Sequence, residues 1–376
     1  WGQLGNENAL GKYDFLARIS SYNDMYMGYV QGAGSNPWTG SIARALENRS
    51  LKWETTDTKN IGFDFGLFGN HLNGNINYYI NETRDLLITR RIAPSAGLDN
   101  PTLIVGKMRN QGFELELNWN DKINDFEYNV GFNISTIANK VVALANEDQT
   151  IYGVGLKYGT EHFPTQTKVG KPIGAFYLYQ ADGIFQSLEE VQAHKNSKGE
   201  LLQPNAQPGD VRFKDMNGDG VIDEDDKTYS GTGIAKVEAN LNLGASYKGF
   251  DFSAVIGSAF GNKLYNGIRY YYEGMNSGSN FLKTTLNAWT PTNTKTDIPR
   301  AVFGDPNQNT RESTRFLENG DFVRLRQVQL GYTLPKALSK HIYCESIRFY
   351  VSAENVFTIT GYSGANPEFS QGVLNS

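Results

Sequence analysis

Residues 214–227, KDMNGDGVIDEDDK, combine residue types and spacing that suit a hard metal cation. Asp215, Asn217 and Asp219 alternate along this stretch, so their side-chain oxygens fall on the first, third and fifth positions of a calcium-binding loop. Gly220 falls on the sixth position, where glycine permits the sharp turn. The predicted ligands, of which Val221 offers its carbonyl, are Asp215, Asn217, Asp219, Val221, Asp223 and Asp226.

These oxygen ligands predict a Ca²⁺ site with a structural role. The twelfth position carries Asp226 instead of the bidentate glutamate of sensor EF-hands. No amphipathic helix follows, because the sequence Tyr-Ser-Gly at 229–231 interrupts the chain. We therefore expect a calcium clip within a long loop, and the alternative is an acidic Gly/Asn turn that needs no metal.

A group of aromatic residues farther along the chain could bind sugar. Tyrosine and tryptophan offer flat apolar faces with a polar group at one end, which suits stacking on sugar rings. The alternative is that these side chains pack within loops or lie at a membrane interface. The predicted substrate-binding residues are Tyr270, Tyr271, Tyr272 and Trp289.

Arrangements that could carry covalent chemistry are weak, so we do not expect an enzyme. Glu114 and Glu116 alternate along one expected strand, as a glycosidase pair might, but in a barrel they would line the polar interior. The histidines show neither the spacing of a metalloprotease nor a neighbouring nucleophile motif. They are His71, His162, His194 and His341.

Composition excludes some classes and leaves others open. The 376 residues carry a net charge of -5, which disfavours nucleic acid as a partner because no basic excess exists to neutralise phosphates. The single cysteine, Cys344, excludes an intrachain disulfide. No run approaches the roughly 18 apolar residues of a membrane helix. Because the sequence begins at Trp1 without a signal peptide, we expect it to be part of a longer protein.

Four pairs of segments alternate between apolar and polar residues, which predicts four β-hairpins. Between Leu325 and Val328 the alternation slips by one residue, which predicts a β-bulge. Weaker runs at 13–22 and 173–180 bring the expected total to about ten strands. The paired segments are 61–68 with 72–80, 113–119 with 126–134, 239–247 with 250–256, and 323–334 with 347–353.

Strand length and loop asymmetry favour a transmembrane antiparallel β-barrel. Strands of about nine or ten residues are the length needed to cross a bilayer at a tilt, against about five or six in soluble sheets. Short turns alternate with long connections at 81–111, 136–238 and 258–321, as in outer-membrane barrels. The polar face is rich in small and amide residues, and aromatic residues lie at strand ends. A large soluble all-β protein, such as a sandwich or a propeller, is the alternative.

Several phrases resemble the SusC/RagA-like TonB-dependent outer-membrane transporters of Bacteroidetes. They follow the order of that family through nearly the whole chain. The phrases are NRSLKWETTDTKNIGFDFGLFGNHLNGNINYYINETRDLL, VGKPIGAFYLYQADGIFQSLEEVQAH, QPGDVRFKDMNGDGVIDEDDKTYSGTG, NGDFVRLRQVQLGYTLP and RFYVSAENVFTITGYSGANPE.

The resemblance implies an all-β protein in which 1–376 form the C-terminal portion of a 22-stranded barrel with long extracellular loops, 136–238 carrying the loop 215–226. It also implies active import of oligosaccharides or peptides across the bacterial outer membrane, energised through TonB and shared with a SusD-like surface lipoprotein. The alternatives are a surface-exposed glycan-binding or adhesion protein without transport, and a passive porin.

Two departures from the family accompany the resemblance. The N-terminal half, with its plug and TonB-contacting segment, has no counterpart here, and a last strand ending in an aromatic residue is not found before Ser376. The strands expected here cannot close such a barrel alone, because an unpaired edge is not tolerated in lipid. We therefore expect the rest of the barrel to lie outside this sequence.

Overall fold

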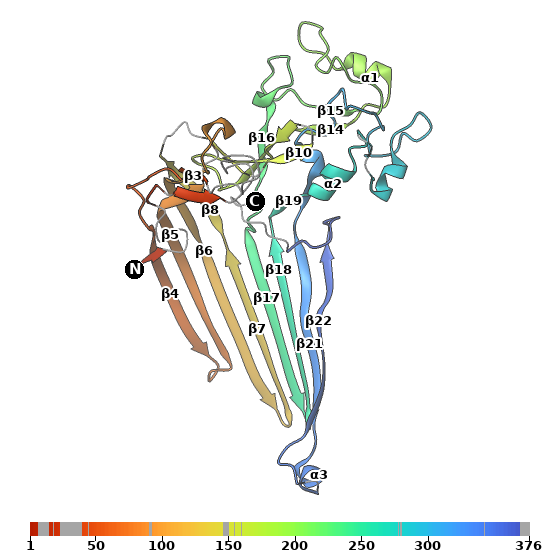
Figure 1. The fold of residues 1–376 in the computed structure, drawn as a ribbon. Coiled ribbons are helices and arrows are strands. Elements are labelled where there is room, and N and C mark those ends of the chain that lie inside the picture. Colours follow the sequence, from red (N-terminus) through yellow and green to blue (C-terminus); the bar gives the residue numbers. More distant parts are fainter. Residues whose placement is uncertain are drawn as a thin grey trace, which may run out of the picture.

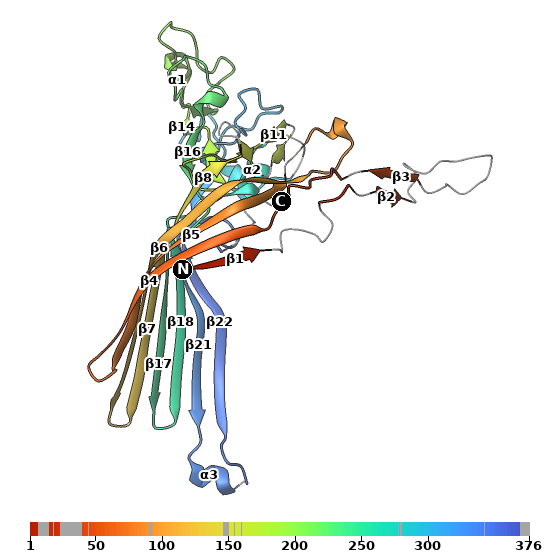
Figure 2. The ribbon, with the colours of Figure 1, turned by 90° about the vertical axis from the view of Figure 1, so that its left-hand side faces the viewer.

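A curved antiparallel sheet of ten strands dominates the computed structural model (Figures 1 and 2). The structure describes residues 1–6, 15–17, 19–22, 40–43, 45–89, 92–145, 150–153, 155–158, 160–276, 278, 280–341 and 343–368. Neighbouring strands follow the order β1-β4-β5-β6-β7-β17-β18-β21-β22, and β8 pairs with β6. Their bounds are β1 Gly2–Asn6, β4 Glu54–Leu67, β5 Leu72–Thr89, β6 Thr102–Ile123, β7 Phe126–Thr136, β8 Ala138–Leu144, β17 Val237–Tyr247, β18 Phe250–Phe260, β21 Phe322–Thr333 and β22 Arg348–Thr360.

The four predicted hairpins are confirmed. They are β4–β5, β6–β7, β17–β18 and β21–β22, and all four turn at the lower end of the sheet in Figure 1. We call this end the turn end and the opposite end the loop end. The predicted bulge is also confirmed, because the register of β21 shifts between Leu325 and Gln327 against β22.

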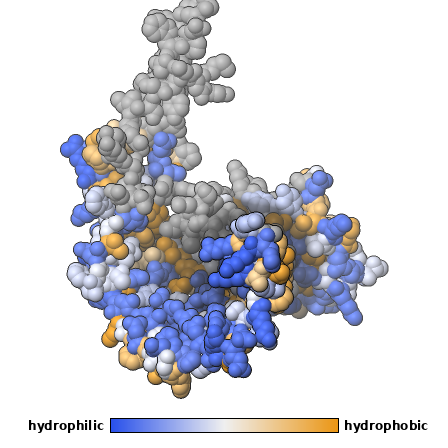
Figure 3. Space-filling view, turned by 90° about the horizontal axis from the view of Figure 1, so that it is seen from below, coloured by the Kyte–Doolittle hydropathy of each residue, from blue (hydrophilic) through white to orange (hydrophobic). Residues whose placement is uncertain are grey.

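One face of the sheet is apolar across eight neighbouring strands. Register places Ile76 of β5 beside Leu115 of β6, and Leu330 of β21 beside both Phe252 of β18 and Val351 of β22. These side chains do not form a core, since Leu330 is 56% and Val351 77% exposed. A continuous exposed apolar face is typical of a lipid-facing sheet and not of a soluble one. In the view from the turn end, hydrophobic patches lie between hydrophilic ones (Figure 3).

Two strands extend well beyond the predicted hairpin, so the long connection expected at 81–111 is wrong. β5 continues to Thr89 and β6 begins at Thr102, which leaves only 90–101 between them. The alternation is lost here because the register shifts between Thr83 and Leu86, where Asp85 has φ 56°. Beyond this point β5, β6 and β8 bury a small core of their own: Leu86, Ile88, Val105, Val141, Leu144 and Ile173.

The two weaker strand predictions fall outside the main sheet. From 13–22 the described strand is β2 (Ile19–Tyr22), paired with β3 (Gly40–Ala43), and residues 13, 14 and 18 lie outside the described part. From 173–180 the strand is β13 (Ala175–Leu178) in a four-stranded sheet with β9 (Ile151–Tyr152), β12 (Thr165–Thr167) and β16 (Thr228–Gly231). The main sheet gains β1 and β8 instead.

Short elements make up the remaining structure. Three pairs of strands form two-stranded sheets: β10 (Leu156–Tyr158) with β11 (Thr160–His162), β14 (Ala181–Ile184) with β15 (Val211–Phe213), and β19 (Lys263–Tyr265) with β20 (Leu317–Asn319). None of the helices in the described part of the chain is long and apolar enough to cross a membrane. They are α1 Leu188–Ala193, α2 Gly267–Tyr272, α3 Lys336–His341 and the 3-10 helices η1 Pro94–Ala96, η2 Glu224–Asp226, η3 Lys283–Asn287 and η4 Thr314–Phe316.

Candidate functional site at the loop end

Two long connections fold against each other at the loop end (Figure 1). We call the described residues of 150–236 and 261–321 the loop assembly. Tyr179 joins the two connections through its backbone, accepting from the amide of Thr314 at 2.9 Å and donating to the carbonyl of Glu312 at 3.1 Å. The amide of Arg300 donates to the carbonyl of Gly209 at 2.8 Å. These contacts make one packed body from segments that are distant in sequence.

A buried ion pair joins the same two connections. Arg300 donates two hydrogen bonds to Asp210, Nε to Oδ1 at 2.7 Å and Nη2 to Oδ2 at 3.0 Å. Asp210 is completely buried, and Asn309 donates to the same carboxylate at 3.0 Å. A two-pronged arginine–carboxylate contact fixes orientation as well as distance. It therefore sets how the two connections meet.

A second buried cluster surrounds Glu312. Lys227 Nζ lies 2.5 Å from Glu312 Oε1, and His162 Nδ1 lies 2.6 Å from Glu312 Oε2. Burial opposes ionisation of Glu312, but the hydrogen bonds from His162 and Lys227 lower its pKa to about 2. Burial also raises the pKa of the neighbouring Tyr179 hydroxyl, which donates to Glu224 at 3.2 Å. The cluster holds its charges in place and presents no free base.

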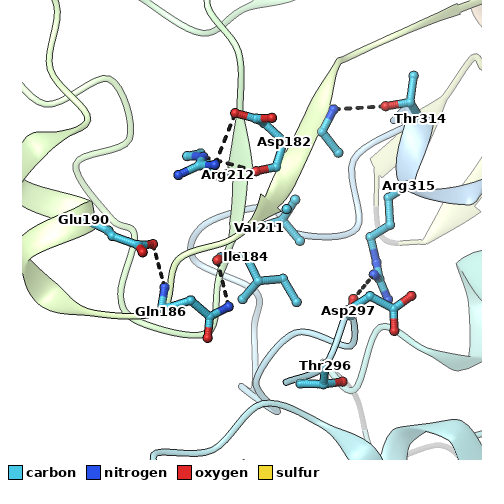
Figure 4. A pocket seen from close by; sticks show the side chains of 12 residues that line it. Asp182, Ile184, Gln186, Glu190, Val211, Arg212, Thr296, Asp297, Thr314 and Arg315 are labelled. Carbon is cyan, nitrogen blue, oxygen red and sulfur yellow. Dashed lines mark hydrogen bonds and ion pairs between the residues drawn. The ribbon is translucent and has the colours of Figure 1, made fainter. Parts of the chain in front are cut away.

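A pocket of about 500 Å³ opens between the two connections (Figure 4). Its wall mixes carboxylates, guanidinium groups, hydroxyls and two buried aliphatic side chains. Arg212 Nε donates to the carbonyl of Asp182 at 3.1 Å, and Arg315 Nη2 donates to Glu273 at 3.0 Å, so both cations already have partners. Such a wall suits binding of a polar ligand. The labelled lining residues are Asp182, Ile184, Gln186, Glu190, Val211, Arg212, Thr296, Asp297, Thr314 and Arg315.

The predicted calcium loop is held by hydrogen bonds from its own backbone. Asp215 accepts from the amides of Gly218 at 2.6 Å and Gly220 at 2.9 Å, and Asp226 accepts from the amides of Met216 at 2.6 Å and Asp223 at 2.9 Å. Among the described residues, no group of three or more His, Cys, Asp or Glu side chains is arranged to hold a metal ion. Calcium binding by Asp215, Asn217, Asp219, Val221, Asp223 and Asp226 stays a prediction.

The four aromatic residues predicted to bind substrate differ in their exposure. Tyr270 is completely buried and packs edge-on against Phe316 at a centroid distance of 5.5 Å. Trp289 is 8% exposed, and its Nε1 donates to Gln186 at 3.0 Å. Neither ring is exposed in this structure, and substrate binding by Tyr270, Tyr271, Tyr272 and Trp289 stays a prediction. Tyr271 is half-buried and Tyr272 is 47% exposed, so Tyr272 is the most accessible of the four.

Sequence reasoning missed the buried polar residues that hold the loop assembly together. Lys227 and Glu312 are 85 residues apart, and Asp210 and Arg300 are 90 apart. No spacing rule links residues so far apart. A weak signal existed in the position of Asp210, which follows a Pro-Gly turn in the phrase QPGDVRF.

An antiparallel sheet with one exposed apolar face, tight turns at one end and long connections at the other is the wall of an outer-membrane β-barrel. Residues 17–356 match the family described as "TonB dependent receptor-like, beta-barrel". The chain belongs to this family, which confirms the resemblance found in the sequence. The family is one of receptors, so the expectation that the chain is not an enzyme is also confirmed.

Individual relatives agree with this assignment. TonB-dependent receptor P3 of Formosa agariphila is 29% identical over 370 residues, covering 98% of this chain and 35% of the relative. TonB-dependent receptor SusC of Bacteroides thetaiotaomicron is 27% identical over 384 residues, covering 99% and 35%. A solved structure of the RagAB peptide transporter superposes with a TM-score of 0.76 at 25% identity, covering 97% of this chain and 37% of that one. The chain spans about a third of the length of these relatives.

Proposed function

We propose that this chain forms the C-terminal part of the barrel wall of a TonB-dependent importer in the bacterial outer membrane. The observation that carries the proposal is the exposed apolar face shared by eight neighbouring strands, which needs a lipid environment. In this arrangement the loop end faces the cell surface and the turn end faces the periplasm. Short periplasmic turns and longer extracellular loops are usual in outer-membrane barrels.

The proposed partners are TonB and a SusD-like surface lipoprotein. SusC and the RagAB transporter are among the proteins that resemble this chain over nearly all of its length. TonB would supply energy from the inner membrane, and the lipoprotein would cover the loop end. The packed loop assembly supports this role, because its fixed ion pairs give a partner a surface of defined shape.

The proposed substrates are oligosaccharides or peptides. RagAB is described as a peptide transporter, which supports peptides, whereas the exposed ring of Tyr272 supports a sugar. The mixed wall of the pocket in Figure 4 offers donors and acceptors to both classes. The polar groups of this wall favour neither peptides nor oligosaccharides.

The test compares uptake with surface binding in cells that carry or lack the full-length protein. Labelled oligosaccharides and peptides are supplied before and after the inner-membrane proton gradient is collapsed. An importer accumulates one of the two classes in the periplasm only while the gradient is present. Binding that stays at the cell surface and ignores the gradient would instead support an adhesion or glycan-binding protein, and gradient-independent uptake would support a passive porin.

A further inference from the structure

The chain that follows β22 turns back over the polar face of the sheet. We call residues 361–368 the return segment. The amide and hydroxyl of Ser363 donate to Glu318 at 2.7 and 2.8 Å, and Asn266 donates to the Ser363 hydroxyl at 3.1 Å. The segment is therefore anchored near its start to the loop assembly.

The far part of the return segment delivers a carboxylate to two arginines of β21. Arg326 Nη2 lies 2.7 Å from Glu368 Oε1, and Arg324 Nη1 donates to Glu368 Oε2. Arg324 Nη2 also donates to Asn366 Oδ1 at 2.7 Å. The Arg324 and Glu368 side chains are 12% and 21% exposed, whereas Arg326 is 46% exposed. The contact is partly shielded and open on the Arg326 side.

The sheet orients Arg324 and leaves room for Arg326 independently of the return segment. Arg324 Nε donates to Thr358 Oγ1 on β22 at 2.8 Å, which orients its guanidinium group. Arg326 lies at the bulge of β21 and passes over Gly257, where an added Cβ would come within 2.1 Å of Arg326 Nε. The glycine thus leaves the space that the arginine fills. Arg324 therefore has a partner on β22 that does not depend on Glu368, and Arg326 has room over Gly257.

Removal of Glu368 and Asn366 would leave three N–H donors facing one position. Two come from Arg324 and one from Arg326, and both groups carry a fixed positive charge. Planar guanidinium groups match the geometry of a carboxylate and bind it with paired hydrogen bonds. The polar face is the one that a closed barrel turns to its interior. The position is therefore reachable by a ligand that passes along the wall.

We propose that Arg324 and Arg326 form a carboxylate-binding site on the interior wall, and that Glu368 occupies this site as an internal substitute for a carboxylate of the imported ligand. This proposal rests on the proposed import function and narrows its substrate class to acidic peptides or uronic-acid glycans. A ligand that carries a carboxylate displaces Glu368 and frees the return segment. Neutral ligands leave the segment in place.

The test measures binding to the full-length protein in detergent by calorimetry. The probes are tetraglutamate and tetragalacturonate, and the neutral controls are tetraglutamine and the methyl ester of tetragalacturonate. Glu368→Gln removes the competing charge, so we expect at least one acidic probe to bind about tenfold more tightly. A tenfold gain corresponds to a site that Glu368 leaves open in about a tenth of the wild-type molecules. Which acid responds identifies the source of the carboxylate.

Two further variants make the result specific. Arg326→Gln added to Glu368→Gln should abolish the gain. Asp251→Asn is the matched control, because it frees the single guanidinium of Arg348, bound to Asp251 through Nε at 3.0 Å, and should give no gain. The proposal is overturned if Glu368→Gln binds both acids no more tightly than the wild type does, or if the double variant keeps the gain.

Heat-modifiable gel migration shows whether the Glu368→Gln variant folds. If it does not fold, a measurement on the wild-type protein tests the proposal instead. Saturating acidic probe should speed amide hydrogen exchange in 361–368, whereas the neutral probe should leave it unchanged. Unchanged exchange with both probes overturns the proposal. Binding is measured without transport, so a failure of import with intact probe binding refutes the proposed function alone.

Discussion

Lys227 Nζ lies 2.5 Å from Glu312 Oε1, and both side chains are only 4% exposed. The first residue comes from the connection before β17 and the second from the connection before β21. A buried charge that loses its partner is costly, because the remaining charge has neither water nor a counter-ion. This pair therefore fastens the two halves of the loop assembly.

Lys227→Met should open the loop assembly while the sheet remains folded. Removing one partner of a buried ion pair typically costs about 3–5 kcal/mol. We expect faster protease cleavage within 160–236, measured by limited proteolysis. We also expect the first melting transition to occur at a lower temperature, measured by calorimetry. Lys122→Met is the matched control, because the Lys122–Glu127 pair is 63% and 55% exposed and should change little. Equal effects of the two variants would contradict a fastening role.

The same cluster predicts acid sensitivity of the loop assembly. The pKa of Glu312 falls to about 2 against an ordinary value of 4.5, since the bonds from His162 and Lys227 outweigh the opposing effect of burial. A group with a lowered pKa stabilises the fold above its unfolded pKa and loses that contribution as the pH falls toward its folded pKa. Amide exchange in 160–180 and 305–316 should therefore rise between about pH 4.5 and 2. Glu312→Gln should remove this rise in amide exchange. If the variant shows the same pH dependence as the wild type, Glu312 is not the group responsible.

Gly209→Ala should destabilise the loop assembly through Trp289. Gly209 has φ +91°, and an added Cβ would lie 2.4 Å from Trp289 Cε3. The left-handed conformation costs a non-glycine residue about 1–2 kcal/mol, and overpacking adds about 1–3 kcal/mol. Gly199→Ala is the matched control, since Gly199 has φ +82° with nothing within 4 Å of the added atom. A larger loss of melting temperature for Gly209→Ala isolates the clash, and tryptophan fluorescence reports it directly.

Calcium should raise the stability of residues 210–230 if the predicted site is loaded. A chelator should then lower a melting step in the loop assembly, and added Ca²⁺ should restore it. Asp215→Asn should abolish the response, because it removes a predicted ligand charge. Asp225→Asn changes the same charge at an exposed residue outside the predicted ligand set and should retain the response. Chelator-insensitive melting of the wild-type protein would identify the loop as a metal-free turn.

Tyr272→Ala should weaken sugar binding without affecting the barrel, because Tyr272 is the residue of the Tyr270–Tyr272 group with an exposed side chain. An aromatic contact of this kind contributes about 0.5–1.5 kcal/mol beyond the buried area. Tyr272→Phe keeps the flat face and should bind nearly as well as the wild type. Calorimetry with an oligosaccharide that the cells import measures both, and equal binding by the alanine variant would exclude a stacking role.

The main sheet was predictable where one face meets lipid and the other meets polar surroundings. There the side chains alternate strictly, so the hairpin at Tyr247 and Phe250 and the bulge after Leu325 were visible in the sequence. Beyond Thr83 the register shifts and Leu86, Ile88 and Val105 pack into a small protein core, so the alternation stops and the sequence looked like a loop. The predicted ends of β5 and β6 were wrong for that reason.

The candidate site was predictable only in part. Loop composition indicated a polar, aromatic region, but burial of Tyr270 depends on Phe316, and charge pairing of Arg324 depends on Glu368. These partners lie 46 and 44 residues away, and no local periodicity connects them. Only the folded chain shows that the exposed ring is Tyr272.

β6 runs without interruption for 22 residues, which at about 3.3 Å per residue makes it ~70 Å long. The hydrocarbon core of a bilayer is only about 30 Å thick, so even a tilted strand leaves a large part of its length in water. The same backbone that is hydrogen-bonded within the lipid-facing wall therefore also carries the small core around Val105 and Val141. Thr102 at the loop end and Ile123 at the turn end therefore belong to one strand, although its pairing with β8 shifts register between Lys107 and Met108.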